Sequence, residues 1–130
     1  MIENLTPSEC WDVLQTNPAA VLVDVRTKME HYFVGHPPGA IHIAWKEAPD
    51  WQLNQNFIAE ISHNIPDLST PVLLLCRSGQ RSLDAAKALE AVGYQRLINI
   101  VDGFEGPLDA DKHRGNLGGW RHSGLPWQQS

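Results

Sequence analysis

The chain has 130 residues, of which 42% are hydrophobic and 19% charged, so it can bury one core without a disulfide or a metal. Its net charge of −5 argues against a nucleic-acid-binding module, because such a module needs a basic face to neutralise phosphates. The two cysteines, Cys10 and Cys76, lie far apart in the sequence and form no disulfide framework. We therefore expect one domain over residues 1–130, with reduced thiols and no nucleic-acid partner.

Targeting and membrane signals are the next feature to consider. The first residues, Met1-Ile2-Glu3-Asn4, lack the basic and apolar regions of a signal peptide. The longest apolar runs, residues 19–23 and 72–76, are far too short to cross a bilayer. These features predict a cytoplasmic protein without a membrane partner, and they leave its oligomeric state open.

Helix and strand signals alternate along the chain. Thr6-Pro7-Ser8-Glu9 has the pattern of a capping box with proline at the first helical position, which predicts a helix over residues 7–16. Apolar residues at steps of three and four predict further helices, and short β-branched or continuous apolar runs predict strands. The further helices are expected over residues 54–65 and 82–92, the latter capped by Ser82 and ended by Gly93, and the strands over residues 20–25, 40–43, 72–75 and 96–101.

This alternation predicts an α/β fold with a parallel sheet of about five strands and helices on both faces. The tail, residues 102–130, is rich in glycine and carries Trp120 and Trp127, which are costly to leave in water. We expect the tail to form an ordered loop with a short helical turn, pinned to the core by both tryptophans. The sequence predicts no role for residues 102–119.

The segment with the clearest chemistry follows the strand expected at residues 72–75, at the sheet edge where ligands bind in such folds. A helix start and two arginines favour negative charge there, and Gly79 lets the loop curl around an anion. Such surroundings favour the thiolate, the nucleophilic form of cysteine. The alternative is an anion-binding loop with an incidental cysteine. We predict that Cys76 is the catalytic nucleophile and that a substrate- or anion-binding loop follows it, made of Arg77, Ser78, Gly79, Gln80, Arg81 and Ser82.

Three motifs together resemble those of the rhodanese-like sulfurtransferases. They occur in the order of the family and cover about residues 6–127. The resemblance implies the rhodanese-like fold, in which an α/β chain forms a parallel sheet of about five strands. The motifs are the loop Cys76-Arg77-Ser78-Gly79-Gln80-Arg81-Ser82, the N-terminal signature Val23-Asp24-Val25-Arg26 with Gly35-His36-Pro37-Pro38-Gly39-Ala40-Ile41-His42-Ile43, and the C-terminal signature Gly119-Trp120 with Gly124-Leu125-Pro126-Trp127.

By that resemblance, Cys76 takes a sulfane sulfur from a donor such as thiosulfate and becomes a persulfide. Cyanide or a thiol then accepts the outer sulfur of this persulfide. The loop amides would stabilise the negative charge of the persulfide, Arg81 would support the loop, and Arg77 would meet the anionic donor. The partners implied are a small anionic sulfur donor and a thiol acceptor. Thioredoxin-like thiols, glutathione and sulfur-carrier proteins suit the family as acceptors, and no cofactor is implied.

Two other function classes stay open at this point. Cysteine phosphatases and arsenate reductases share the fold, but they resemble each other in having five residues between the cysteine and the arginine, whereas four separate Cys76 from Arg81. A loop with four should close around a single sulfur atom and clash with a phosphoryl group. A non-catalytic rhodanese-like binding module would have lost the cysteine or the loop, and this chain has lost neither.

Asp24 and Arg26 are predicted to support the site. A carboxylate disfavours a thiolate beside it, so we assign Asp24 a structural role, either accepting hydrogen bonds from loop amides or pairing with Arg26. An ion pair between Arg26 and Glu30 is a further option. The family carries its glutamate four residues before the glycine, where this chain has His31, so that Glu30 lies one residue earlier.

The remaining histidines and the second cysteine suggest no separate chemistry. The six histidines and two cysteines show no metal-ligand spacing, so no metal site is expected. His36, beside a Pro-Pro-Gly turn, is expected to be a hydrogen-bonded structural residue. Cys10 lies on the apolar face of the first helix, where we expect it to pack instead of resolving a persulfide.

Overall fold

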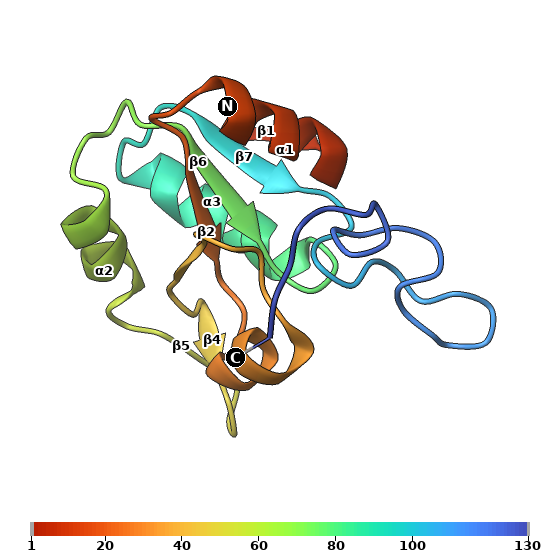
Figure 1. Ribbon diagram of the computed structural model, residues 1–130. Coiled ribbons are helices and arrows are strands. Elements are labelled where there is room, and N and C mark those ends of the chain that lie inside the picture. Colours follow the sequence, from red (N-terminus) through yellow and green to blue (C-terminus); the bar gives the residue numbers. More distant parts are fainter. Residues whose placement is uncertain (1, 130) are drawn as a thin grey trace.

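In the computed structural model, which describes residues 2–129, strands and helices alternate along the chain (Figure 1). The longer elements coincide with the segments that the hydrophobic pattern predicts. In chain order the elements are β1 (Ile2–Leu5), α1 (Pro7–Thr16), β2 (Val21–Asp24), the π-helix η1 (Glu30–Val34), β3 (Ile41–His42), β4 (Lys46–Glu47), β5 (Gln52–Leu53), α2 (Phe57–Asn64), β6 (Val72–Leu75), α3 (Gln80–Ala91) and β7 (Leu97–Ile100).

The main sheet has the strand order β1-β7-β6-β2-β3, and all of its strand pairs are parallel. Its central strand β6 pairs with β2 on one side and β7 on the other, so that Val72 lies opposite both Val21 and Leu97. All four residues of β6 are buried. These observations confirm the predicted α/β fold with a parallel sheet of about five strands.

The edge strand β1 is absent from the sequence-based prediction. Two of its four residues, Glu3 and Asn4, are exposed. An edge strand has one free flank, so its hydrophobic signal is weak. Its register with β7 places Asn4 opposite Asn99, which brings a polar pair to an otherwise apolar part of the sheet.

Helices cover both faces of the sheet, as predicted, and Figure 1 shows α1 and α3 on opposite sides. Because neighbouring side chains of a strand point to opposite faces, each strand feeds two cores. The core on the α1 side contains Cys10, Leu22, Leu73, Leu75, Ile98, Ile100, Phe104 and Trp120. The core under α2 and α3 contains Val23, Phe57, Ile61, Val72, Leu74, Ala85, Ala86 and Leu89.

The helix starts show one prediction confirmed and one wrong. Thr6 and Glu9 form the expected capping box of α1, since the Thr6 amide donates to Glu9 Oε1 at 2.9 Å and the Glu9 amide donates to Thr6 Oγ1 at 3.2 Å. Ser82, however, does not cap α3. The helix begins at Gln80 after Gly79, and the Ser82 hydroxyl bonds instead to Asn99 of β7.

The C-terminal tail forms turns and no regular helix between residues 102 and 129. The Ser123 amide donates to the Gly119 carbonyl at 3.0 Å, four residues back, which is a single helical turn as predicted. Trp120 is fully buried and donates from Nε1 to the carbonyl of Pro126 at 2.7 Å. Trp127 remains 42% exposed and contacts Phe104 edge-on. Trp120 therefore anchors the tail to the core as predicted. Trp127 contacts the core through Phe104, but it is only partly buried.

Two features remain outside the main sheet. Strands β4 and β5 pair antiparallel as a small hairpin near the carboxyl end of the sheet (Figure 1). Within residues 2–129, every helix is too short or too polar to cross a membrane.

Candidate active site

Cys76 lies at the carboxyl end of β6, directly after Leu75, and only 1% of its surface is exposed. The backbone amide of Gly79 donates a hydrogen bond to Cys76 Sγ at 3.0 Å. The hydroxyl oxygen of Ser82 lies 3.3 Å from the same sulfur. Hydrogen-bond donors aimed at a sulfur stabilise negative charge on it. The loop therefore supplies polar contacts to the cysteine that precedes it.

The loop turns from β6 into α3 at Gly79, whose φ of 114° is rarely adopted by other residues. A Cβ atom at this position would meet nothing nearer than 3.6 Å, so the backbone angle and not the space requires glycine. Because α3 starts at Gln80, its unpaired amides and the positive end of its dipole face the loop. Arg77, Ser78 and Gln80 are exposed, and Gln80 donates to Asp84 one turn along the helix.

The segment after β7 fixes the backbone of the loop through hydrogen bonds to its carbonyl groups. The Phe104 amide donates to the Cys76 carbonyl at 2.8 Å, and the Glu105 amide donates to the Arg77 carbonyl at 3.0 Å. This approach is so close that a Cβ on Gly103 would lie 2.4 Å from the Cys76 carbonyl oxygen. The segment that the sequence left without a role thus fixes the backbone that carries the cysteine.

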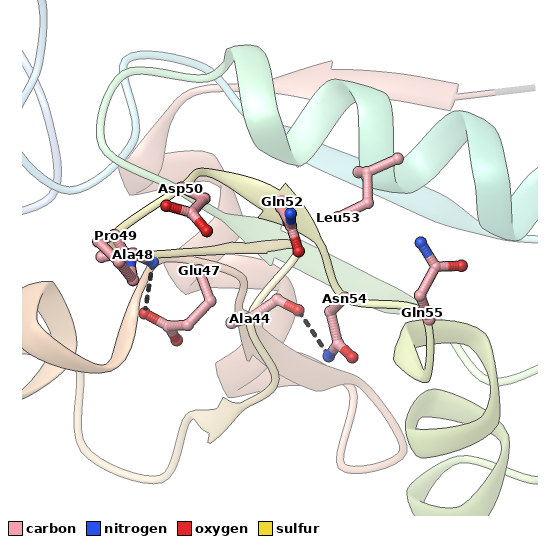
Figure 2. A pocket seen from close by; sticks show the side chains of 9 residues that line it. All are labelled: Ala44, Glu47, Ala48, Pro49, Asp50, Gln52, Leu53, Asn54 and Gln55. Atoms are coloured by element: carbon pink, nitrogen blue, oxygen red, sulfur yellow. Dashed lines mark hydrogen bonds between the residues drawn. The ribbon is translucent and has the colours of Figure 1, made fainter.

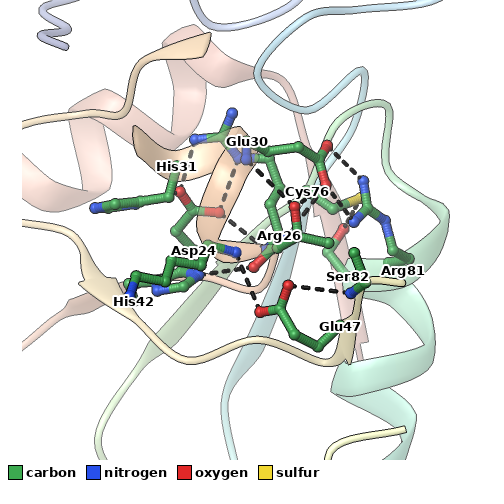
Figure 3. A network of polar contacts seen from close by, with 12 residues as sticks. Asp24, Arg26, Glu30, His31, His42, Glu47, Cys76, Arg81 and Ser82 are labelled. Carbon is green, nitrogen blue, oxygen red and sulfur yellow. Dashed lines mark hydrogen bonds and ion pairs between the residues drawn. The ribbon is translucent and has the colours of Figure 1, made fainter. Parts of the chain in front are cut away.

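Arg81 is held by Glu30 of η1, as Figure 3 shows. Its two terminal nitrogens lie 2.8 and 2.9 Å from the two carboxylate oxygens, and the side chains are only 14% and 17% exposed. Burial alone would raise the pKa of Glu30, but the hydrogen bonds and charge of Arg81 lower it below its usual value. Burial likewise opposes the charge of Arg81, yet Glu30 and then the Cys76 sulfur raise its pKa. Both groups therefore stay charged.

Trp51, in the turn between β4 and β5, completes the surroundings of Arg81. The Arg81 guanidinium lies 5.1 Å from the centre of the Trp51 ring, within the range of a cation–π contact. Trp51 is 51% exposed and has a φ of 55°, a conformation that is rare for an aromatic residue. The hairpin thus presents an aromatic ring at the rim of the loop.

Asp24 and Arg26 form a second, fully buried pair. Arg26 Nε donates to one Asp24 oxygen at 2.9 Å, its Nη2 donates to the other at 2.6 Å, and the same nitrogen reaches the Gly35 carbonyl at 2.6 Å. Burial alone would raise the pKa of Asp24, but hydrogen bonds from His31 and Arg26 and the charge of Arg26 lower it to about 2. The predicted pairing of Asp24 with Arg26 is confirmed.

The optional ion pair between Arg26 and Glu30 does not form, because Asp24 takes Arg26 and Glu30 takes Arg81. The π-helix η1 explains this arrangement. A π turn contains one residue more than an α turn, so η1 absorbs the extra residue between Glu30 and Gly35 while Glu30 still reaches the loop. His31 then turns toward Asp24, with its Nδ1 at 2.9 Å from the carboxylate.

Three imidazole rings stack beside this buried pair. The His31 ring lies 3.9 Å from that of His36 and 4.6 Å from that of His42, at interplanar angles of 9° and 24°. His36 Nδ1 lies 2.9 Å from the His31 carbonyl, and His42 Nε2 lies 2.7 Å from the Arg26 carbonyl. His36 is therefore a hydrogen-bonded structural residue, as predicted.

A cavity of about 420 Å³ lies in and beside the β4–β5 hairpin, and Figure 2 shows its lining. No residue of the loop at 76–82 lines it. Its walls mix polar and apolar side chains. Among the polar ones, the Asn54 amide donates to the Ala44 carbonyl at 2.9 Å, and Glu47 accepts from the Lys28 amide at 3.1 Å. The cavity is lined by Ala44, Glu47, Ala48, Pro49, Asp50, Gln52, Leu53, Asn54 and Gln55.

The second cysteine is buried like the first, but it lies in apolar surroundings away from the loop. Cys10 is fully buried in the core on the α1 side. Burial raises the pKa of its thiol to about 12, and the nearby Glu9 and Glu3 add to the effect. Cys10 therefore packs as an inert apolar residue, as predicted.

Three residues of this region escaped the sequence analysis as site residues: Glu30, Trp51 and Asn99. Glu30 was visible as a departure from the family spacing, although its partner was not. Asn99 carries a signal that could have been used, because it is a polar residue within the apolar run of β7. Trp51 has no such signal, since its place depends on the hairpin.

The chain is similar in sequence and structure to several known proteins. A family model described as a rhodanese-like domain matches residues 6–108. The crystal structure of Rv0390 from M. tuberculosis is similar with a TM-score of 0.89 and 44% identity, covering 98% of both chains. The RP600 homolog of Rickettsia rickettsii, an uncharacterized protein, is 38% identical and also covers 98% of both chains. The thiosulfate sulfurtransferase GlpE of Haemophilus influenzae (strain PittEE) is 29% identical over 80% of this chain and 86% of its own.

Proposed function

The chain belongs to the rhodanese-like domain family and is related to GlpE-type thiosulfate sulfurtransferases, and from that premise we propose that it is a sulfurtransferase that carries a sulfane sulfur on Cys76. The observation that carries the proposal is the surroundings of the sulfur. A backbone amide donates to Cys76 Sγ at 3.0 Å, and the charged Arg81 is held beside the loop by Glu30. A hydrogen-bond donor and a nearby positive charge would stabilise the negative charge of a persulfide on this cysteine.

The proposed reaction has two steps. The Cys76 thiolate attacks the outer sulfur of thiosulfate, so that a sulfur–sulfur bond forms on the cysteine and sulfite leaves with the electron pair of the broken bond. A nucleophile, either cyanide or a thiolate, then attacks the outer sulfur of the persulfide. That step releases thiocyanate or a new persulfide and restores the Cys76 thiolate.

The two arginines of the loop, Arg77 and Arg81, have different roles in this proposal. Arg81 is tied to Glu30 and covered by Trp51, so its role is to hold the loop and its positive potential. Arg77 is exposed at the rim and is the cation that would meet an anionic donor. Gly79, through its amide, and Ser82, through its hydroxyl, contact the sulfur that bears the charge. Ser78 and Gln80 are exposed and would contribute their backbone amides.

Asp24 and Arg26 have a structural role in this proposal and do not contact the sulfur. They lie at the end of β2, next to β6 in the sheet, and their buried pair reaches the start of η1 through His31. Removal of either partner would leave an unpaired buried charge, which is strongly destabilising. Their role is therefore to position η1, which carries Glu30 to the loop.

Phosphate hydrolysis is the rival chemistry, and loop length argues against it. Four residues separate Cys76 from Arg81, and the Gly79 amide already lies at hydrogen-bond distance from the sulfur. A loop of this length is expected to close around a single sulfur atom, so that a tetrahedral phosphoryl group would clash with its amides. A hydrolase would also need a general acid for its leaving group.

The test compares sulfur transfer and phosphate hydrolysis in the same preparation. Wild-type protein should transfer sulfur from thiosulfate to cyanide and hydrolyse an aryl phosphate negligibly. Cys76→Ser should abolish transfer without unfolding the protein, whereas Cys10→Ser should leave most of the turnover. Transfer that survives Cys76→Ser, or hydrolysis faster than transfer, would overturn the proposal.

A further inference from the structure

A buried asparagine interrupts the apolar strand β7. Asn99 is 4% exposed, and its Oδ1 accepts a hydrogen bond from Ser82 Oγ at 2.5 Å. Its Nδ2 donates to Asn4 Oδ1 of the neighbouring strand at 3.0 Å. Since Ser82 Oγ lies 3.3 Å from Cys76 Sγ, a chain of polar contacts runs from the sulfur through α3 and β7 to the exposed side chain of Asn4.

The Ser82 hydroxyl has one proton and three acceptors within reach. These acceptors are Asn99 Oδ1 at 2.5 Å, the Gly79 carbonyl at 3.1 Å and the Cys76 sulfur at 3.3 Å. While Asn99 presents its oxygen, the proton points toward Asn99 and away from the sulfur. A neutral thiol suits this arrangement because it can donate its own proton to Ser82 Oγ. An anionic sulfur accepts from the Gly79 amide, and it would gain a second hydrogen bond only if the Ser82 proton were free.

A second arrangement satisfies the anionic sulfur. If the amides of Asn99 and Asn4 both turn over, Asn99 Nδ2 donates to Ser82 Oγ and Asn4 Nδ2 donates to Asn99 Oδ1. The Ser82 proton is then free for the sulfur, and the number of hydrogen bonds in the chain is unchanged. Asn4 is exposed and accepts from Asn99 through its side chain, so its amide can turn in water.

We propose that Asn99 is a positioning residue that acts through Ser82: the orientation of its amide decides whether the Ser82 hydroxyl donates to Asn99 or to the Cys76 sulfur. Asn4 sets that orientation from the edge of the sheet. The inference rests on the proposed role of Cys76 as nucleophile. It explains why a strand that is otherwise fully apolar keeps an amide beside the loop.

The test measures the rate at which iodoacetamide alkylates Cys76 near neutral pH, read by mass spectrometry of the modified peptide. In this reaction the thiolate attacks the methylene carbon and displaces iodide, so the rate follows the anionic sulfur and requires no sulfur transfer. Cys10, fully buried, serves as the internal reference in each sample. Asn99→Leu removes the acceptor at similar volume and should raise the rate about threefold to tenfold, because the Ser82 proton becomes free for the sulfur. Asn99→Asp, which only accepts and adds negative charge, should lower it about tenfold or more.

The decisive comparison repeats Asn99→Leu in a Ser82→Ala background. The rate should not respond there, because the hydroxyl that transmits the effect is gone, and Ser82→Thr should restore the response. Tyr94→Phe is the matched control, since it loses a buried hydrogen bond of 2.6 Å to the Ile65 carbonyl, outside the loop, and should leave the rate unchanged. A response to Asn99→Leu of equal size with and without the hydroxyl, or the same direction of change for Leu and Asp, would overturn the inference.

The exposed end of the chain provides a variant that does not depend on a core substitution. Asn4→Ala removes the oxygen that holds the Asn99 amide, so the rate should rise in the native background and not with Ser82→Ala. A flat response in both backgrounds would overturn the inference even if Asn99→Leu failed to fold. If these responses appear in a protein that transfers no sulfur, the proposed function fails alone. If sulfur transfer is present and the responses are absent, the inference about Asn99 fails alone.

Discussion

Replacing Glu30 by glutamine removes the negative partner of Arg81 while keeping the size of the side chain. The pair is bidentate, with contacts of 2.8 and 2.9 Å, and its side chains are 14% and 17% exposed. An exposed ion pair contributes up to about 1 kcal/mol, whereas breaking a fully buried one costs about 3–5 kcal/mol. The intermediate burial and the one hydrogen bond that glutamine can still accept indicate a loss of about 2 kcal/mol.

The assay for Glu30→Gln has two parts. A loss of that size should lower the melting temperature by about 8 °C in a domain of this length. Sulfur transfer from thiosulfate should fall about tenfold, because Arg81 is no longer held beside the loop. Glu3→Gln is the matched control, since its pair with Arg96 is 3.3 Å long and 43–45% exposed, and it should change neither quantity appreciably. Equal melting temperatures and equal transfer rates for Glu30→Gln and wild type would refute the reasoning.

Backbone contact, loop length and acid titration each make a separate prediction. Gly103→Ala should destabilise the protein by more than about 2 kcal/mol in urea unfolding, because its Cβ would lie 2.4 Å from the Cys76 carbonyl oxygen. Gly115→Ala is the control: a Cβ there would meet nothing within 4 Å, so the substitution should cost only about 1 kcal/mol. Equal costs for the two variants would contradict the close contact at Gly103. One glycine inserted after Gly79 should lower sulfur transfer tenfold or more, and unchanged transfer would refute the loop-length argument. Asp24 should titrate in the folded protein with a pKa of about 2. The folding stability that this carboxylate contributes is therefore complete above about pH 4 and is lost as the pH falls toward 2. The NMR signal of its carboxyl carbon reports the titration, and a midpoint at or above pH 4 would exclude the buried pair.

Local features of the chain were predictable from sequence because their causes lie within a few residues. The capping box at Thr6 and Glu9 is satisfied by a contact over three positions. The loop after β6 needs only a strand, a glycine and a helix in succession. The parallel sheet follows from the alternation of these elements, so its class was predictable although the edge strand β1 was not.

Contacts between distant segments were beyond the sequence analysis. Glu30 and Arg81 are 51 positions apart, and they meet because η1 contains a π turn that no hydrophobic pattern reveals. Trp51 reaches Arg81 only because a hairpin forms between two strands of two residues each. The expectation that Ser82 caps a helix was wrong because its hydroxyl finds a buried partner, Asn99, on another element.

The central claim is that Cys76 carries the transferred sulfur, and the mass of the intact protein tests it most directly. After incubation with thiosulfate and removal of the excess, the wild-type protein should gain the mass of one sulfur atom, on the peptide that contains Cys76. Addition of cyanide should remove that mass and release thiocyanate. A protein that gains no sulfur, or that gains it on the peptide of Cys10, would contradict the account.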